Sequence, residues 1–137
     1  MKVITPEKLA ENNSENGHQA ALFCWASMNI KKYPELKWLF AIPNGDLRNP
    51  IVANRLKSTG VKPGIPDICL LVKRNKYACL WIELKKPAKD GKRAGIVSDE
   101  QKEWITQANE SGHAAVVAYG WEHARDLIVF YLEMKDW

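Results

Sequence analysis

The sequence has few cysteines, no long apolar run and no histidine cluster. Its three cysteines are an odd number and none belongs to a Cys-x-x-Cys pair, which argues against a disulfide framework or a zinc site. No apolar stretch approaches the length that crosses a bilayer, and the segment MKVITPEKLAENNSENG lacks the apolar core of a signal peptide. The three histidines lack the spacing of a metal site or nucleophilic triad. We therefore expect a cytoplasmic protein with no membrane partner.

The charge of the chain is only mildly one-sided, with 20 Lys and Arg against 16 Asp and Glu. A net charge of +4 is compatible with a polyanionic partner, but it is common in proteins that bind no nucleic acid. One basic cluster, opposed only by Asp90, consists of Lys85, Lys86, Lys89, Lys92 and Arg93. On charge alone, the simpler interpretation is a solvated loop that keeps the protein soluble.

Hydrophobic periodicity predicts one domain over residues 14–137, preceded by a loosely ordered leader at residues 1–13. Helices are expected over residues 15–32, 50–58, 98–112 and 121–133, and strands over residues 37–42, 67–72, 78–85 and 114–119. A turn is expected at Pro43-Asn44-Gly45. The strand at 67–72 is almost wholly apolar, which indicates a sheet covered on both faces. The order predicts an α/β fold with a central mixed four-stranded sheet flanked by helices.

Three charged side chains interrupt two of these apolar strands. Glu83 and Lys85 are two residues apart, so they point to the same face of their strand. Asp67 heads the strand expected to pair with it antiparallel, which can bring its carboxylate beside Glu83. Two converging carboxylates repel each other unless a cation lies between them, and such oxygen ligands suit Mg²⁺ or Mn²⁺. An ammonium beside the ion can hold a water molecule for attack on a phosphate.

The same residues also allow a structural interpretation. A Glu-x-Lys pair in a strand is more often an exposed ion pair, and a Pro-Asp pair more often begins a strand or turn. Unpaired charges are costly among apolar neighbours, so Glu83 and Lys85 need a partner or a purpose. A buried structural ion pair is the main alternative to a catalytic site.

The ordered combination of motifs resembles the VRR-NUC branch of the PD-(D/E)XK nucleases, in particular its small stand-alone members from phages and bacteria. The motifs are Gly64-Ile65-Pro66-Asp67, Trp81-Ile82-Glu83-Leu84-Lys85, Ser98-x-x-Gln101-x-x-Trp104, Glu15-x-x-x-Gln19, Ile42-Pro43-Asn44-Gly45 and Gly120-Trp121-x-x-Ala124. The resemblance covers the chain from about Ser14 onward. It implies a restriction-endonuclease-like core and an intracellular protein of a phage or bacterium.

The resemblance also implies a role for individual residues. Asp67, Glu83 and the backbone carbonyl of Leu84 would bind the metal, and Lys85 would orient the attacking water. Glu15 is the best match for a further acidic ligand, although the helix macrodipole favours an acid in a first helical turn anyway. Gln101 would support the lysine, the water or the phosphate.

Other residues have competing interpretations. Gln101 is also placed to complete a capping box with Ser98, and both roles are compatible. The basic residues Lys86, Lys89, Lys92 and Arg93 follow the catalytic strand and are expected to contact phosphates, with Gln19 joining them from the first helix.

The function that we expect is a Mg²⁺- or Mn²⁺-dependent DNA endonuclease, and the resemblance implies that it is structure-selective. The resemblance implies branched substrates such as four-way junctions and action as a homodimer, since one domain offers one active site and a junction needs two symmetric cuts. Two alternatives stay open. One is a non-catalytic nucleic-acid-binding accessory module on the same fold, and the other is an α/β domain whose charges form a structural pair.

Overall fold

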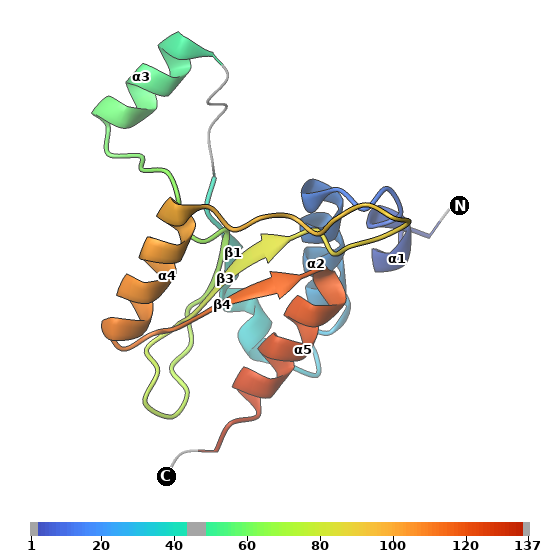
Figure 1. Ribbon diagram of the computed structural model, residues 1–137. Coiled ribbons are helices and arrows are strands. Elements are labelled where there is room, and N and C mark those ends of the chain that lie inside the picture. The colour runs from blue at the N-terminus through green and yellow to red at the C-terminus, as the bar shows by residue number, and fades with distance from the viewer. Residues whose placement is uncertain (1–2, 44–48, 136–137) are drawn as a thin grey trace.

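A four-stranded mixed sheet lies at the centre of the structure, a computed structural model that describes residues 3–43 and 49–135. The strands are β1 (Leu39–Ala41), β2 (Ile68–Leu70), β3 (Leu80–Lys85) and β4 (Ala114–Tyr119), and they lie in that order across the sheet. The pairs β1–β2 and β2–β3 are antiparallel, whereas β3 and β4 are parallel. Helices flank this sheet (Figure 1). The predicted α/β fold with a mixed four-stranded sheet is confirmed.

Helices cover both faces of the sheet. The side chains of β3 point alternately to these two faces. Leu80, Ile82 and Leu84 belong to the main apolar core, which α2 (Glu15–Met28) and α5 (Trp121–Leu132) cover. The opposite face packs against α4 (Asp99–Glu110). Every residue of β2 is buried, as expected for a strand covered on both faces.

Local capping explains where the three predicted helices α2, α3 and α4 begin. The Ser14 hydroxyl accepts a hydrogen bond from the amide of Gly17 at the start of α2. Ser98 and Gln101 form a capping box at the start of α4. Asn49 caps α3 (Pro50–Ser58), whose first residue is a proline. These starts agree with those predicted from the sequence.

The structure differs from the sequence prediction in two short elements. Thr5 caps a four-residue helix, α1 (Pro6–Leu9), which packs against α2, so this part of the expected loose leader has regular structure. The predicted strand at 37–42 is shorter, because its start belongs to the 3₁₀ helix η1 (Pro34–Trp38). Elements of four or five residues are too short to show a hydrophobic period, and proline at their first position was the only local signal.

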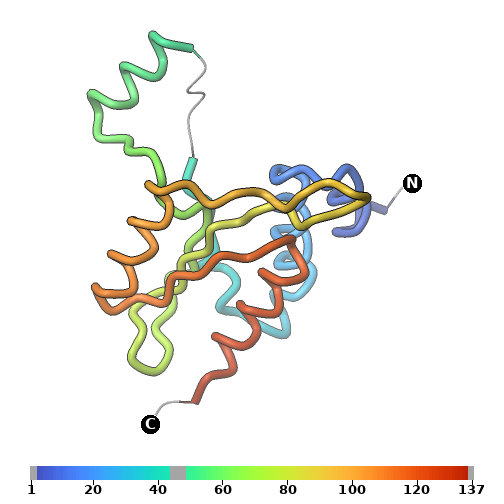
Figure 2. Tube along the Cα trace, viewed as in Figure 1, coloured from blue at the N-terminus to red at the C-terminus, as the bar shows by residue number. Residues whose placement is uncertain are grey.

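The remaining differences concern ends and connections. Helix α2 ends at Met28 with Asn29 as its C-cap, before the predicted end at residue 32. The expected turn at Pro43-Asn44-Gly45 falls largely outside the described residues. Helix α3 stands apart from the rest of the fold (Figures 1 and 2), and none of its residues is buried. Among the described residues, no helix has the length and apolarity needed to cross a membrane.

Candidate active site

Asp67 is held at the junction of three strands. The register that pairs Ile68 with Ile82 brings Asp67 opposite Glu83 when it is continued by one residue. The Asp67 carboxylate accepts a hydrogen bond from the amide of Leu84 at 3.0 Å, and its carbonyl accepts one from the amide of Ile42 at 2.7 Å. The predicted approach of Asp67 to the catalytic strand is therefore present in the structure.

Glu83 and Lys85 are both buried, with residue exposures of 1% and 7%. The Lys85 ammonium lies 3.5 Å from Glu83 Oε1 and 3.8 Å from Glu15 Oε1. Strand alternation places both side chains on one face, where Gln101 of α4 contacts Glu83 and the backbone at Gly95 lies next to Lys85. The carboxylates of Glu15 and Glu83 thus both lie within ion-pair distance of the Lys85 ammonium group.

Gln101 connects the start of α4 to this cluster: it forms the expected capping box, and its other side-chain contact is with Glu83 rather than with Lys85. Its side-chain amide donates a hydrogen bond to Glu83 Oε1 at 2.7 Å, while its side-chain oxygen accepts one from the amide of Ser98 at 2.8 Å. The capping box fixes the rotamer of Gln101, and Gln101 in turn fixes the orientation of the Glu83 carboxylate.

The second oxygen of Glu83, Oε2, is buried without a hydrogen-bond partner among the described residues. Burial and the negative charge of Asp67 raise the pKa of Glu83 to about 8, while Lys85 lowers it. A buried carboxylate that lacks a partner on one oxygen is costly unless a further group satisfies it. Both the geometry and the electrostatics therefore favour the approach of a cation to this edge of Glu83.

The protein side chains alone do not build a complete metal cage. Within residues 3–43 and 49–135, no three His, Cys, Asp or Glu side chains converge closely enough to hold an ion. The groups that could contribute to an ion site are the carboxylates of Asp67 and Glu83 and the backbone carbonyl of Leu84. This set suits Mg²⁺ better than most ions, because Mg²⁺ keeps several of its waters and uses only one or two carboxylates.

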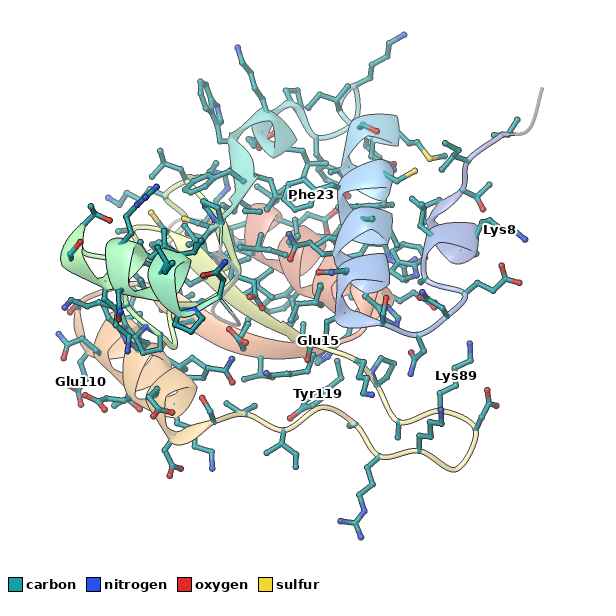
Figure 3. All side chains as sticks on the ribbon, turned by 90° about the horizontal axis from the view of Figure 1, so that it is seen from above. Lys8, Glu15, Phe23, Lys89, Glu110 and Tyr119 are labelled. Carbon is teal, nitrogen blue, oxygen red and sulfur yellow. The ribbon has the colours of Figure 1, made fainter. Side chains whose placement is uncertain are left out.

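A polar pocket of about 390 Å³ opens beside these residues. It is bounded by Asp67 and Leu84 from the sheet, by Glu15 and Gln19 from α2, and by Ile42 and neighbouring residues from the end of β1. The Glu15 side chain is 49% exposed and lies at the start of α2 (Figure 3). The predicted contributions of Glu15 and Gln19 thus come from the wall of this pocket, not from its buried end.

Gly95 is a feature of the site that the sequence analysis missed. A Cβ atom added there would lie 3.1 Å from Glu15 Oε1 and 3.2 Å from Lys85 Cδ. The backbone after β3 therefore passes directly over the two side chains, where a larger residue would displace one of them. Its only signal in the sequence is a glycine among basic residues, which by itself indicates no more than a loop.

The four basic residues after β3 lie on a loop that projects from the sheet. Lys89, Lys92 and Arg93 are exposed, whereas Lys86 is half-buried. Lys89 and Lys92 pair across a tight turn, and Figure 3 shows Lys89 on the outstretched part of this loop. This placement leaves three positive charges accessible to a polyanion on the same connection that covers Lys85.

His18 has a structural role that the sequence did not predict. Its Nδ1 accepts a hydrogen bond from the amide of Trp121 at 3.1 Å, so the neutral ring donates from Nε2 to the Asn13 side-chain oxygen at 2.7 Å. Asn13 donates in turn to the carbonyl of Pro87 at 3.0 Å. Burial, and then the charge of Lys89, lower the pKa of His18. This clip ties the start of α2, the basic loop and the start of α5 together.

Comparisons with known proteins agree with this arrangement. The model of the VRR-NUC domain matches residues 9–122. A solved structure of a VRR_NUC domain protein superposes with a TM-score of 0.70 and 25% sequence identity, over 99% of this chain and 94% of that one. Among curated proteins, none matches this sequence. Because the matched region includes the sheet, Asp67, Glu83 and Lys85, the chain belongs to the VRR-NUC domain family of nuclease domains.

Proposed function

We propose that the protein is a divalent-metal-dependent endonuclease of the PD-(D/E)XK type that hydrolyses phosphodiester bonds in DNA. The observation that carries this proposal is the buried Glu83 carboxylate, which stands opposite Asp67 and keeps one oxygen without a partner among the described residues. A structural ion pair with Lys85 accounts for Oε1 alone. It does not account for Oε2 or for the polar pocket that Asp67 and Glu15 line.

Mg²⁺ or Mn²⁺ would be held by Asp67, Glu83 and the Leu84 carbonyl, with Glu15 at the pocket wall as a possible further ligand. The bound ion would neutralise charge that builds up on the scissile phosphate and lower the pKa of a coordinated water. Support comes from the donor set, which is made of hard oxygens, and from the raised pKa of Glu83, which is caused by burial and then by the negative charge of Asp67.

Side chains of the protein would position the attacking water, orient the Glu83 carboxylate and bind the DNA backbone. Lys85 is buried and fixed by two carboxylates, so its ammonium can hold the attacking water in line with the phosphorus. Gln101 keeps the Glu83 carboxylate in one orientation. The exposed Lys89, Lys92 and Arg93, with Lys86 nearer the strand and Gln19 at the pocket, would bind backbone phosphates next to the cut. The products would carry 5′-phosphate and 3′-hydroxyl ends.

Branched DNA, including four-way junctions, is the substrate class that we propose, with the protein acting as a homodimer. One chain contains one such site, and symmetric cleavage of a junction requires two. The setting would be the cytoplasm of a bacterium or of a phage-infected cell.

The decisive experiment compares wild-type protein with Lys85→Ala on linear, flap and four-way-junction DNA. We expect cutting with Mg²⁺ or Mn²⁺, none with EDTA, and a fall of about a thousandfold or more in the variant, because a positioned catalytic group contributes on that scale. Lys31→Ala is the matched control, since it removes an exposed ammonium outside the buried cluster and outside the basic loop and should keep most of the cleavage.

Circular dichroism and a DNA-binding assay at low salt establish that the Lys85→Ala variant is folded and still binds. If wild-type protein bound DNA but cut none of these substrates with either metal, the enzyme proposal would fail and an accessory binding module would remain. If Mn²⁺ titration detected no site that Glu83→Gln abolishes, the structural ion pair would be the better account.

A further inference from the structure

Two large apolar side chains are exposed next to the buried Lys85 ammonium. Ile96 is 82% exposed and Tyr119 is 41% exposed. Single exposed apolar residues are common on protein surfaces and need no special explanation. These two differ, because backbone contacts fix both of them to the strand that carries the candidate active site. Neither has a role in the hydrolysis proposed above.

Tyr119 ends β4 on the same face of the sheet as Lys85. The register of the two parallel strands pairs Lys85 with Tyr119, and neighbouring strands lie about 4.8 Å apart. Ala118, one residue earlier, belongs to the apolar core on the opposite face, so the Tyr119 side chain points away from that core. In the view from above, Tyr119 lies in the same region as Glu15 and the loop that follows β3 (Figure 3).

The backbone around Tyr119 is held on both sides. Its amide donates a hydrogen bond to Nδ1 of His123 at 3.0 Å, and the next amide, that of Gly120, donates one to the carbonyl of Lys85 at 2.8 Å. An aromatic ring on a fixed backbone loses little conformational freedom when a ligand stacks on it. Tyr119 therefore has the properties of a preorganised stacking platform.

Ile96 is fixed next to the same cluster by the basic loop that joins β3 to α4. The Gly95 amide donates a hydrogen bond to the Lys86 carbonyl at 3.0 Å, which closes this loop. A Cβ atom on Gly95 would lie 3.2 Å from Lys85 Cδ, and two residues after Ile96 the cap residue Ser98 begins α4. Ile96 is thus held between two anchored points, although its side chain is almost fully exposed.

The surroundings of the two residues favour a nucleobase as their partner. The basic loop also carries the exposed Lys89, Lys92 and Arg93, which attract a polyanion. Proteins that bind unpaired strands combine positive charge along the backbone with aromatic rings that stack on bases, and isoleucine is one of the side chains that insert between base steps. A base that is already unpaired or poorly stacked costs less to expose than one inside a continuous duplex.

We propose that Tyr119 and Ile96 hold an unstacked base of the DNA next to the scissile phosphate. The Tyr119 ring stacks on the base, and Ile96 makes an apolar contact beside it. Both residues select branched DNA and take no part in the hydrolysis itself. This inference rests on the proposed nuclease function, and it identifies the side chains that recognise the branched structure.

Binding without metal tests the selection. Fluorescence anisotropy in EDTA compares a four-way junction with a linear duplex of the same sequence. Tyr119→Ala should weaken junction binding by about tenfold, the scale of one stack between a base and an aromatic ring, and should change duplex binding by less than about twofold. Ile96→Ser should act in the same direction. Phe130→Ala, which removes a ring that is 68% exposed near the end of α5, is the matched control and should bind both DNAs as wild type does.

Tyr119→Phe separates stacking from hydrogen bonding by the hydroxyl group, because it keeps the ring. It should retain the junction preference. A photo-cross-link detects the stack directly: 5-iodouracil placed at the branch should cross-link to Tyr119 on irradiation, since an iodinated base reacts with an aromatic ring stacked against it, and mass spectrometry identifies the residue.

Equal losses of junction and duplex binding in Tyr119→Ala would overturn the inference. A Tyr119→Phe variant as weak as Tyr119→Ala, or a cross-link that forms elsewhere and not at Tyr119, would do the same. These measurements involve no cleavage. Junction-selective binding through Tyr119 by a protein that cuts no DNA would contradict the nuclease proposal alone, and metal-dependent cleavage without any effect of Tyr119 on DNA selection would contradict this inference alone.

Discussion

The sheet around β3 and the projecting α3 break the usual rule of burial in opposite directions. In β3, a carboxylate and an ammonium are buried in the interior, whereas in α3 a large aliphatic side chain, Ile51, lies in water. Charged residues are almost never fully buried unless paired, and an exposed apolar helix face usually marks an interaction surface. Each anomaly therefore marks a surface whose partner the described residues do not supply; for the first region, the partner that we propose is a cation and a phosphate.

The largest stability contrast should come from trimming one isoleucine in each region. Ile82→Ala removes a side chain with 0% exposure and should lower the free energy of unfolding by roughly 2 to 5 kcal/mol. Ile51→Ala, at 72% exposure, should change it by less than about 0.5 kcal/mol. Urea unfolding at a protein concentration low enough to keep the chain monomeric measures both. Equal losses would mean that α3 is part of the monomer core.

A smaller contrast in stability and cleavage is expected within the site, where Gln101 completes a helix cap and also donates a hydrogen bond to the Glu83 carboxylate. Ser98→Ala removes the cap acceptor and should cost about 1 kcal/mol of stability, with little loss of cleavage. Gln101→Leu should cost a similar amount of stability and also lower kcat by at least about tenfold, because Glu83 loses its hydrogen bond. Thermal unfolding and single-turnover cleavage separate the two effects. Equal cleavage by both variants would mean that Gln101 contributes to the helix cap and not to cleavage.

The smallest expected effect concerns pH and the His18 clip. Because the pKa of His18 is lowered in the folded state, the unfolded chain binds a proton more readily. The neutral imidazole thus contributes stability above its ordinary pKa of 6.5, and this contribution is lost as pH falls through the lower folded value.

Urea midpoints of wild-type protein and His18→Gln should therefore converge as pH is lowered from 7 to 5. His123→Gln, at an exposed position, controls for the loss of a histidine as such and should keep its offset from wild type constant. If the difference in urea midpoint between His18→Gln and wild type also stayed constant, the hydrogen bonds of His18 would not contribute to the loss of stability at low pH.

The sequence predicted those parts of the fold in which local pattern and tertiary environment agree. The apolar run at 67–72 implied a doubly covered strand, and the spacing of Glu83 and Lys85 implied one face, because strand alternation is independent of what packs on it. Gln101 was identified twice, once from the capping box and once from the resemblance; the capping-box contact is present, whereas its hydrogen bond to Glu83 was not predicted.

The missed features depend on approaches between distant segments. Gly95 matters only because its backbone passes over Glu15 and Lys85, and His18 only because residues near 13, 87 and 121 meet around it. A single residue forms no periodic pattern in the sequence, so these contacts could not be predicted from it. The bounds of helix α3 were predicted correctly. Its separation from the rest of the fold could not be predicted, because propensity and capping specify a helix without specifying where it lies.

Strand β3 is hydrogen-bonded along both of its edges, antiparallel to β2 and parallel to β4. Amides in such a central strand exchange with solvent only when most of the fold opens. The separation of its acidic and basic side chains is consequently preserved through ordinary thermal motion, as preorganised chemistry requires. The DNA substrate that we propose would have to adapt its own shape to this rigid strand, and bending a duplex costs energy that a branch point reduces.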